Sequence, residues 1–215
     1  MKLIEIANYL VFTAEYIVVL PILVAFYFRA YHKKELKLLM IGLCATLLLD
    51  IVGVWFFFSM KNTTLYFFTA IDILTASFVF STALPKGQVS KIIGYSGFAL
   101  LPLIAFDAFF WSGTHNNGLS NTIAVVLISV FAIYYLTQLF RDSRVVKLTE
   151  EPMFWVSIGV LVNNVIAFFD VFSEPMLAYS QNMYLQFYMV WSVATIFMYC
   201  SYAYAFWLGK RLYKG

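Results

Sequence analysis

The hydrophobic positions of this chain gather into seven long runs that are separated by short polar connectors. The runs cover about residues 3–28, 38–58, 65–84, 92–111, 119–140, 153–172 and 183–208. A helix rises about 1.5 Å per residue, so each run is long enough to cross about 30 Å of hydrocarbon. The pattern predicts an all-α polytopic membrane protein, with residues 1–215 forming a single domain of seven transmembrane helices.

The composition agrees with this class. Hydrophobic residues make up 63% of the chain and charged residues only 12%, whereas a soluble domain usually carries about 25% charged residues. No stretch is long and polar enough for a separate kinase, nuclease or nucleotide-binding module. The net charge of +3 is small, so we expect the lipid bilayer as a partner and no nucleic acid.

The basic residues indicate how the helices are oriented. All except Lys2 and Lys61 lie in the first, third and fifth connectors and in the carboxyl-terminal tail. Because cytoplasmic connectors are enriched in Lys and Arg, this alternation predicts an amino terminus outside and a carboxyl terminus in the cytoplasm. The expected location is the inner membrane of a bacterial cell, as a multi-pass protein.

Acidic residues inside the apolar runs are the main candidates for function. Five of them occur on five different runs, with no Lys or Arg inside the same runs: Glu15, Asp50, Asp72, Asp107 and Asp170. An ionisable group in hydrocarbon costs several kcal/mol and often marks a functional site. A single carboxyl group can also be protonated and bonded across helices, where it serves packing alone.

Depth and helical spacing sharpen this prediction. Asp72, Asp50 and Glu15 lie about 10, 12 and 18 Å below the predicted outer boundary, counted at about 1.5 Å per residue. Asp107 and Asp170 lie nearer the outer ends of their runs. Polar neighbours share the acidic helix faces, as Asn163 does with Asp170, and such faces should turn inward. We therefore predict an acidic pocket open to the outside, built from the five acids and Asn163.

The sequence lacks the residues that several kinds of chemistry require. The seventh run has no interior Lys for a retinal Schiff base, and His32 and His115 lie in connectors on opposite sides, so a histidine-based metal site is not expected. The chain has no nucleophile elbow, phosphate loop or HExxH motif. We assign no catalytic residue and no cofactor, although two aspartates sharing a proton could still act as acid and base.

Three short segments carry a resemblance to a known group of proteins. They are Glu150–Trp155 running into Ile158–Leu161, the approach Glu35–Lys37 to the second run, and Phe68–Asp72 in the third. These segments resemble small uncharacterised seven-span inner-membrane proteins of Bacteroidota. The resemblance implies a bacterial inner-membrane protein linked to sensing, and it transfers no catalytic residue.

Three functional hypotheses follow. The first is a sensor or receptor-like module whose acidic pocket binds a cation, a proton or a small polar ligand and signals to a cytoplasmic partner. The second is a transporter or channel for protons or cations. The third is a lipid hydrolase that depends on two aspartates. We rank them in this order, because the acids lie on one side of the predicted membrane and no output domain is present.

Overall fold

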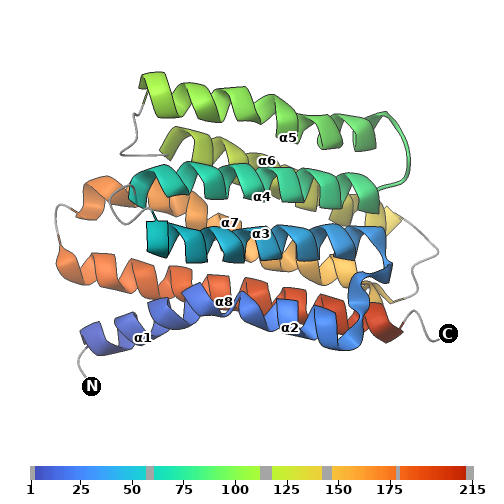
Figure 1. Cartoon of the computed structure of the whole chain (residues 1–215), viewed down its shortest axis with the longest axis horizontal. Coiled ribbons are helices and arrows are strands. Elements are labelled where there is room, and N and C mark those ends of the chain that lie inside the picture. Colours follow the sequence, from blue (N-terminus) through green and yellow to red (C-terminus); the bar gives the residue numbers. More distant parts are fainter. Residues whose placement is uncertain (1–2, 57–60, 112–117, 142–146, 178–179, 212–215) are drawn as a thin grey trace.

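The computed structural model describes residues 3–56, 61–111, 118–141, 147–177 and 180–211. All elements in these ranges are helices (Figure 1). In chain order they are α1 (Leu3–Tyr16), α2 (Val19–Phe28), the short η1 (Ala30–His32), α3 (Lys34–Phe56), α4 (Lys61–Ala83), α5 (Gln88–Phe106), the π-helical η2 (Asp107–Trp111), α6 (Gly118–Arg141), the short η4 (Leu148–Glu150), α7 (Pro152–Leu177) and α8 (Gln181–Arg211).

Seven segments of the described chain are long and apolar enough to cross a membrane. α1 and α2 together form the first segment, and α5 with η2 forms the fourth. The predicted all-α fold with seven spans is confirmed, while the orientation of the termini stays a prediction. Several helices begin before the apolar run does; α3 begins at Lys34 and not at residue 38, because polar residues extend the helix toward the membrane surface.

The first span is broken by a proline. Pro21 has no backbone N–H, so it cannot donate to the carbonyl of Ile17 as a regular helix requires. Leu20 N–H donates to that carbonyl instead, at 2.9 Å, and α1 ends at Tyr16 before α2 begins at Val19. Pro102 lies inside α5 without interrupting it. Pro21 thus divides its span into two helices, and Pro102 does not divide α5.

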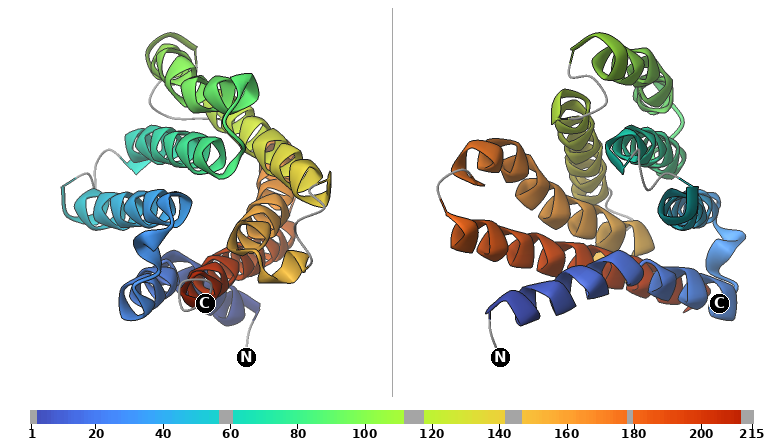
Figure 2. Two further views of the ribbon diagram at one scale, coloured as in Figure 1. Left: turned by 90° about the vertical axis from the view of Figure 1, so that its right-hand side faces the viewer. Right: turned by 60° about the vertical axis from the view of Figure 1, so that its left-hand side comes forward.

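The spans follow one another around a ring. α2, α3, α4, α6, α7 and α8 are neighbours in that order, and α8 returns to pack against both α1 and α2 (Figure 2). α5 stands outside the ring, where it packs against α4 and to a smaller extent against α6. One face of each ring helix therefore borders a common interior.

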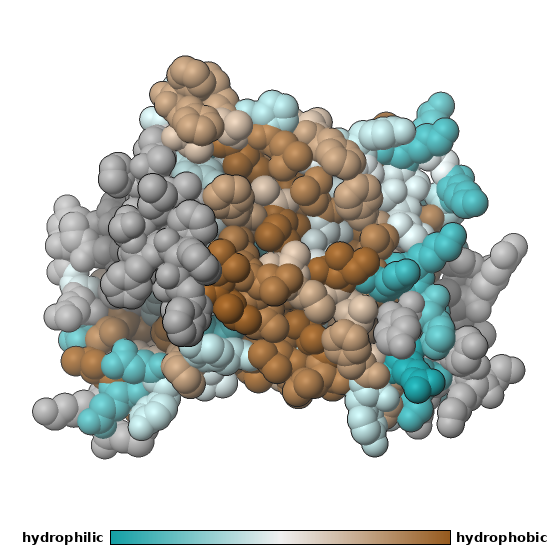
Figure 3. Space-filling view, in the orientation of Figure 1, coloured by the Kyte–Doolittle hydropathy of each residue, from teal (hydrophilic) through white to brown (hydrophobic). Residues whose placement is uncertain are grey.

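The two ends of this bundle differ in charge. We call the end that holds the α2–α3, α4–α5 and α6–α7 connectors and the end of α8 the basic end, and the other the opposite end. Two ion pairs lie at the basic end: Lys33 Nζ with Glu151 Oε1 at 3.4 Å, and Lys147 Nζ with Glu150 Oε1 at 3.0 Å. Figure 3 shows an apolar band between hydrophilic ends, as expected for a protein in a bilayer.

Burial is also uneven between the two ends. On α3 the last buried residue is Leu43, and none of the described side chains from residue 44 to 53 is buried. On α8 the first buried residue among those described is Ser192, and on α7 the last is Asn164. On α3, α7 and α8 burial thus falls off toward the opposite end, whereas Tyr66 on α4 and Ser120 on α6 remain buried there.

Candidate functional site

Three of the predicted acids face a common region. Asp50 on α3 lies within electrostatic range of Asp72 on α4, and it lies within such range of Glu15 on α1 as well. Helices α3 and α4 are ring neighbours, which accounts for the approach of the two aspartates. The sequence could place these residues at similar depth, but only the order of the helices around the ring brings them together.

These acids have no basic partner within the described chain. Its only two ion pairs are the ones at the basic end. Asp50, Asp72 and Glu15 also make no hydrogen bond in the described ranges. A carboxylate that lacks both a cation and a hydrogen-bond donor is costly inside a membrane protein. The region therefore holds carboxyl groups that have neither a basic partner nor a hydrogen bond in the described chain.

Helix α4 shows where the interior opens. Asp72 is exposed, whereas Val79, two turns along the same face, is only 1% exposed. Helix α3 repeats this change, because Asp50 is half-buried and Leu43, also two turns away, is 5% exposed. Two turns correspond to about 10 Å. Thr69, one turn beyond Asp72 toward the opposite end, is again only 4% exposed. The access is therefore local to the two acids, which lie above the buried Leu43 and Val79.

Two tyrosines of α8 complete this hollow. The charge of Asp72 acts on both Tyr199 and Tyr202, and that of Asp50 acts on Tyr199 as well. The two rings meet edge to face, with centroids 6.0 Å apart. Tyr202 is a core residue at 6% exposure. We call Glu15, Asp50, Asp72, Tyr199 and Tyr202 the acidic hollow.

Two close contacts between helices indicate the heights of these residues along the axis of the bundle. A methyl group at Gly42 would overlap the Thr75 side chain on α4, and one at Gly209 would lie 2.6 Å from Leu36 Cδ1. Counting along the antiparallel helices from these contacts places Asp72 and Tyr199 at about one level. Tyr202 lies about one turn nearer the basic end, at the floor.

The predicted site residue Asn163 has a partner on another helix. Its Oδ1 accepts a hydrogen bond from Thr195 Oγ1 at 3.1 Å, which joins α7 to α8. The adjacent Asn164 donates to Val125 O and to Ser129 Oγ, both at 3.2 Å, and joins α7 to α6. Asn163 thus has a packing role, and its role in binding stays a prediction.

Asp107 belongs to a different part of the molecule. It is 0% exposed, and its Oδ2 accepts a hydrogen bond from Ser120 N–H at 2.9 Å. Ser120 lies in the first turn of α6, whose amides have no partner within their own helix. Asp107 therefore caps α6, which explains a buried acid without a ligand. The side chain of Asp170 lies outside the described residues.

The sequence alone did not single out Tyr199 and Tyr202, because the chain contains 15 tyrosines and they are spread over its length. A usable signal exists on α8, where Ser192, Thr195, Tyr199 and Tyr202 follow one another at helical spacing in an apolar segment. Such a polar stripe should face the interior and not the lipid. Its coincidence with the unpaired acids becomes visible only in the folded ring.

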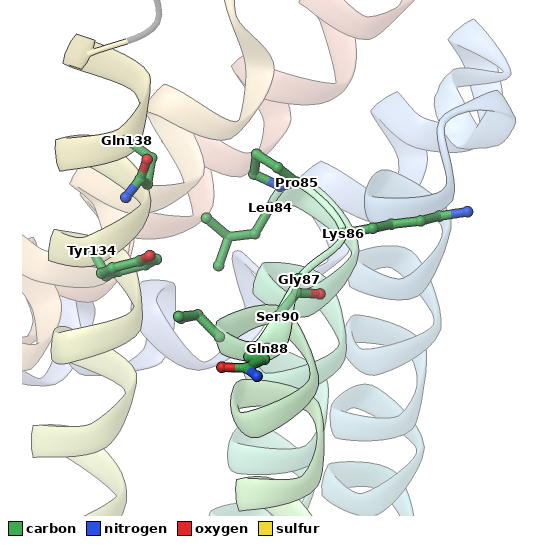
Figure 4. Close-up of a pocket in the computed structure, with 9 residues that line it drawn as sticks. Leu84, Pro85, Lys86, Gly87, Gln88, Ser90, Tyr134 and Gln138 are labelled. Carbon is green, nitrogen blue, oxygen red and sulfur yellow. The ribbon is translucent and has the colours of Figure 1, made fainter.

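The hollow does not have the geometry of a metal centre. Within the described residues, no three His, Cys, Asp or Glu side chains lie close enough to hold a metal ion. A separate cavity of about 200 Å³ lies at the basic end, between the α4–α5 connector and α6. Figure 4 shows Tyr134 and Gln138 on its α6 wall, while Lys86 extends away from it. This cavity contains no acidic residue.

The fold defines the class as a membrane protein with seven helices long and apolar enough to span a bilayer. Comparison with family models, with curated proteins and with solved structures gives no match. The functional argument therefore depends on the geometry of the hollow.

Proposed function

We propose that this protein is a receptor-like membrane module that binds a cation, a proton or a small polar ligand in the acidic hollow. One observation carries the proposal: the unpaired carboxyl groups of Asp50 and Asp72 border accessible space that is closed beneath them by Leu43 and Val79. A pocket with a closed floor suits binding more than continuous conduction. Its negative charge favours a cationic ligand.

The floor offers a physical connection to the basic end. Phe206, one turn beyond Tyr202 on α8, is fully buried. Gly209 follows on the same helix and packs against Leu36 at the start of α3. A ligand that moves α8 relative to α3 would therefore change the position of the basic connectors. These connectors supply the surface for a cytoplasmic partner under the predicted orientation.

Spin labels at the basic end test this coupling. Cys44 and Cys200, both free thiols, are replaced by Ser, and Lys34→Cys and Thr149→Cys introduce labels at two exposed positions. The inter-label distance is measured in nanodiscs between pH 5 and 8 with sodium, potassium or methylammonium. We expect at least one condition to shift the distance distribution, and the double variant Asp50→Asn/Asp72→Asn to abolish the shift.

The matched control is Glu5→Gln, which removes an exposed acid on α1 outside the hollow and should preserve the response. An unchanged distance distribution for every cation and pH would reject the receptor role. A shift that persists in the double aspartate variant would reject the hollow as its source.

A transporter is the second candidate, because the first span is broken two residues after Glu15. Broken helices that border a cavity are typical of transporter sites. Flux of the same cations into proteoliposomes under an imposed gradient decides between the two functions. The aspartate-dependent lipid hydrolase receives no such support, since Asp50 and Asp72 share no hydrogen bond in the described chain.

A further inference from the structure

The cavity at the basic end is separate from the acidic hollow and has no part in the proposed function. It encloses about 200 Å³ between the α4–α5 connector, the start of α5 and α6. Pockets for drug-sized ligands typically enclose about 300–1,000 Å³, so this cavity suits one small polar group. Among its lining residues, the side chains of Gln88, Tyr134 and Gln138 make no hydrogen bond within the described chain. The Tyr134 hydroxyl points from α6 toward the connector (Figure 4).

The depth of the cavity is that of the lipid headgroups. The third span ends at Ala83 and the fourth begins at Gln88, and the connector between them forms one wall. The fifth span ends at Arg141, one turn beyond the lining residues of α6. Next to the cavity, Ile92 on α5 and Ile133 on α6 are exposed and offer apolar surface to acyl chains.

The charges around the cavity have one sign. Residues 73–106 and 118–141 include its walls, and their charged side chains are Lys86, Lys91 and Arg141, with no acidic residue. None of these three belongs to an ion pair in the described chain. Lys86 extends away from the cavity (Figure 4), so the donors inside it are neutral groups. Such surroundings favour an anion, and basic pockets between transmembrane helices are typical sites for anionic lipid headgroups.

We propose that this cavity binds the phosphate group of an anionic phospholipid. The phosphate oxygens accept hydrogen bonds from the Tyr134 hydroxyl and from the side-chain amides of Gln88 and Gln138. Lys91 and Arg141, on α5 and α6, offset the negative charge of the phosphate. A soluble phosphate ester shares this chemistry, and the depth of the cavity favours the lipid as its source. The site does not depend on the acidic hollow, so either proposal can fail without the other.

Native mass spectrometry of the protein in a neutral detergent tests the ligand class. The Kd of the first bound lipid is measured for phosphatidylglycerol and phosphatidylcholine with identical acyl chains. We expect phosphatidylglycerol to bind at least about ten-fold more tightly, because phosphatidylcholine has the same phosphate but no net charge. Equal affinities would overturn the proposal. Glycerol 3-phosphate has no acyl chains and should not displace the lipid; displacement at equal concentration would overturn the lipid as the source of the phosphate.

A matched pair of lysines separates a site from general attraction to the basic end. Lys91 and Lys37 are both exposed, and each is the fourth residue of its helix at the basic end, α5 and α3 respectively. Lys91→Gln should weaken phosphatidylglycerol affinity about five-fold. Lys37→Gln removes the same charge away from the cavity and should leave the Kd at the wild-type value. An equal loss in both variants would overturn the site, because the lipid would then respond to net charge alone.

Tyr134→Phe tests the cavity itself without changing any charge. It removes one hydroxyl donor from a half-buried residue and should weaken phosphatidylglycerol affinity about five-fold. Tyr204→Phe is the control, because Tyr204 is exposed on α8 beside Trp155, and its Kd should equal that of the wild type. Unchanged affinity in Tyr134→Phe would overturn the assignment of the phosphate to this cavity.

Discussion

Removal of the Asp107 carboxyl group should destabilise the fold without affecting the acidic hollow. Asp107 Oδ2 accepts the Ser120 N–H at 2.9 Å, and both residues are 0% exposed. Loss of a helix cap costs about 1 kcal/mol, and a buried donor that loses a charged acceptor costs about 1.5–3 kcal/mol. We therefore expect Asp107→Ala to lower the free energy of unfolding by about 2–3 kcal/mol.

Reversible unfolding of the purified protein in mixed micelles, titrated with a denaturing detergent, measures this loss. Asp107→Asn is the matched control, because the amide retains an oxygen that accepts from Ser120, and it should cost less than about 1 kcal/mol. The cation- or pH-dependent shift at the basic end should persist in Asp107→Asn. A stability of Asp107→Ala within about 0.5 kcal/mol of wild type would refute the capping role, and loss of the shift in Asp107→Asn would place this acid in the binding site.

Three further predictions use the same unfolding assay. Gly159→Ala should cost about 1–2 kcal/mol, because its methyl group would lie 3.2 Å from a backbone Cα atom of α8; Gly53→Ala, whose methyl group would meet only a side-chain methyl at 3.3 Å, should leave stability within about 0.5 kcal/mol of wild type. Asn164→Ala removes two bonds from α7 to α6 and should cost about 1–2 kcal/mol; no loss would show that these bonds do not hold the helices together. Lys33→Ala breaks the ion pair with Glu151, whose side chains are 33% and 25% exposed, and should cost less than about 1 kcal/mol; a larger loss would assign this pair a structural role.

The number and approximate bounds of the spans were predictable, because each apolar run has the length that a bilayer requires. The break at Pro21 was predictable as well, since a missing N–H acts locally. Pro102 also lies inside a helix, and α5 continues past it to Phe106. Rules based on neighbouring residues in the sequence thus predict single helices well. They do not predict contacts between helices that lie far apart in the sequence.

The surroundings of the acidic residues likewise depend on contacts between helices. Hydropathy placed both Asp72 and Asp107 inside apolar runs as candidate site residues, with Asp107 nearer the outer end of its run. Their difference arises from tertiary structure: at the start of α6 the Ser120 N–H donates to Asp107, and no such bond to Asp72 exists in the described chain. The sequence gave even less indication that the tyrosines of α8 lie near the acids, because that depends on which helices pack against α8.

The hollow is better explained as a site than as a packing defect. A defect would be lined by truncated apolar side chains, whereas here the residue type changes along two neighbouring helix faces in the same direction. On α3 the face passes from Leu43 to Asp50, and on α4 it passes from Val79 to Asp72. Each change forgoes the favourable packing that an apolar residue would give at that position. Two acids at such positions lower the stability of the fold, and a cation bound as proposed would offset that cost.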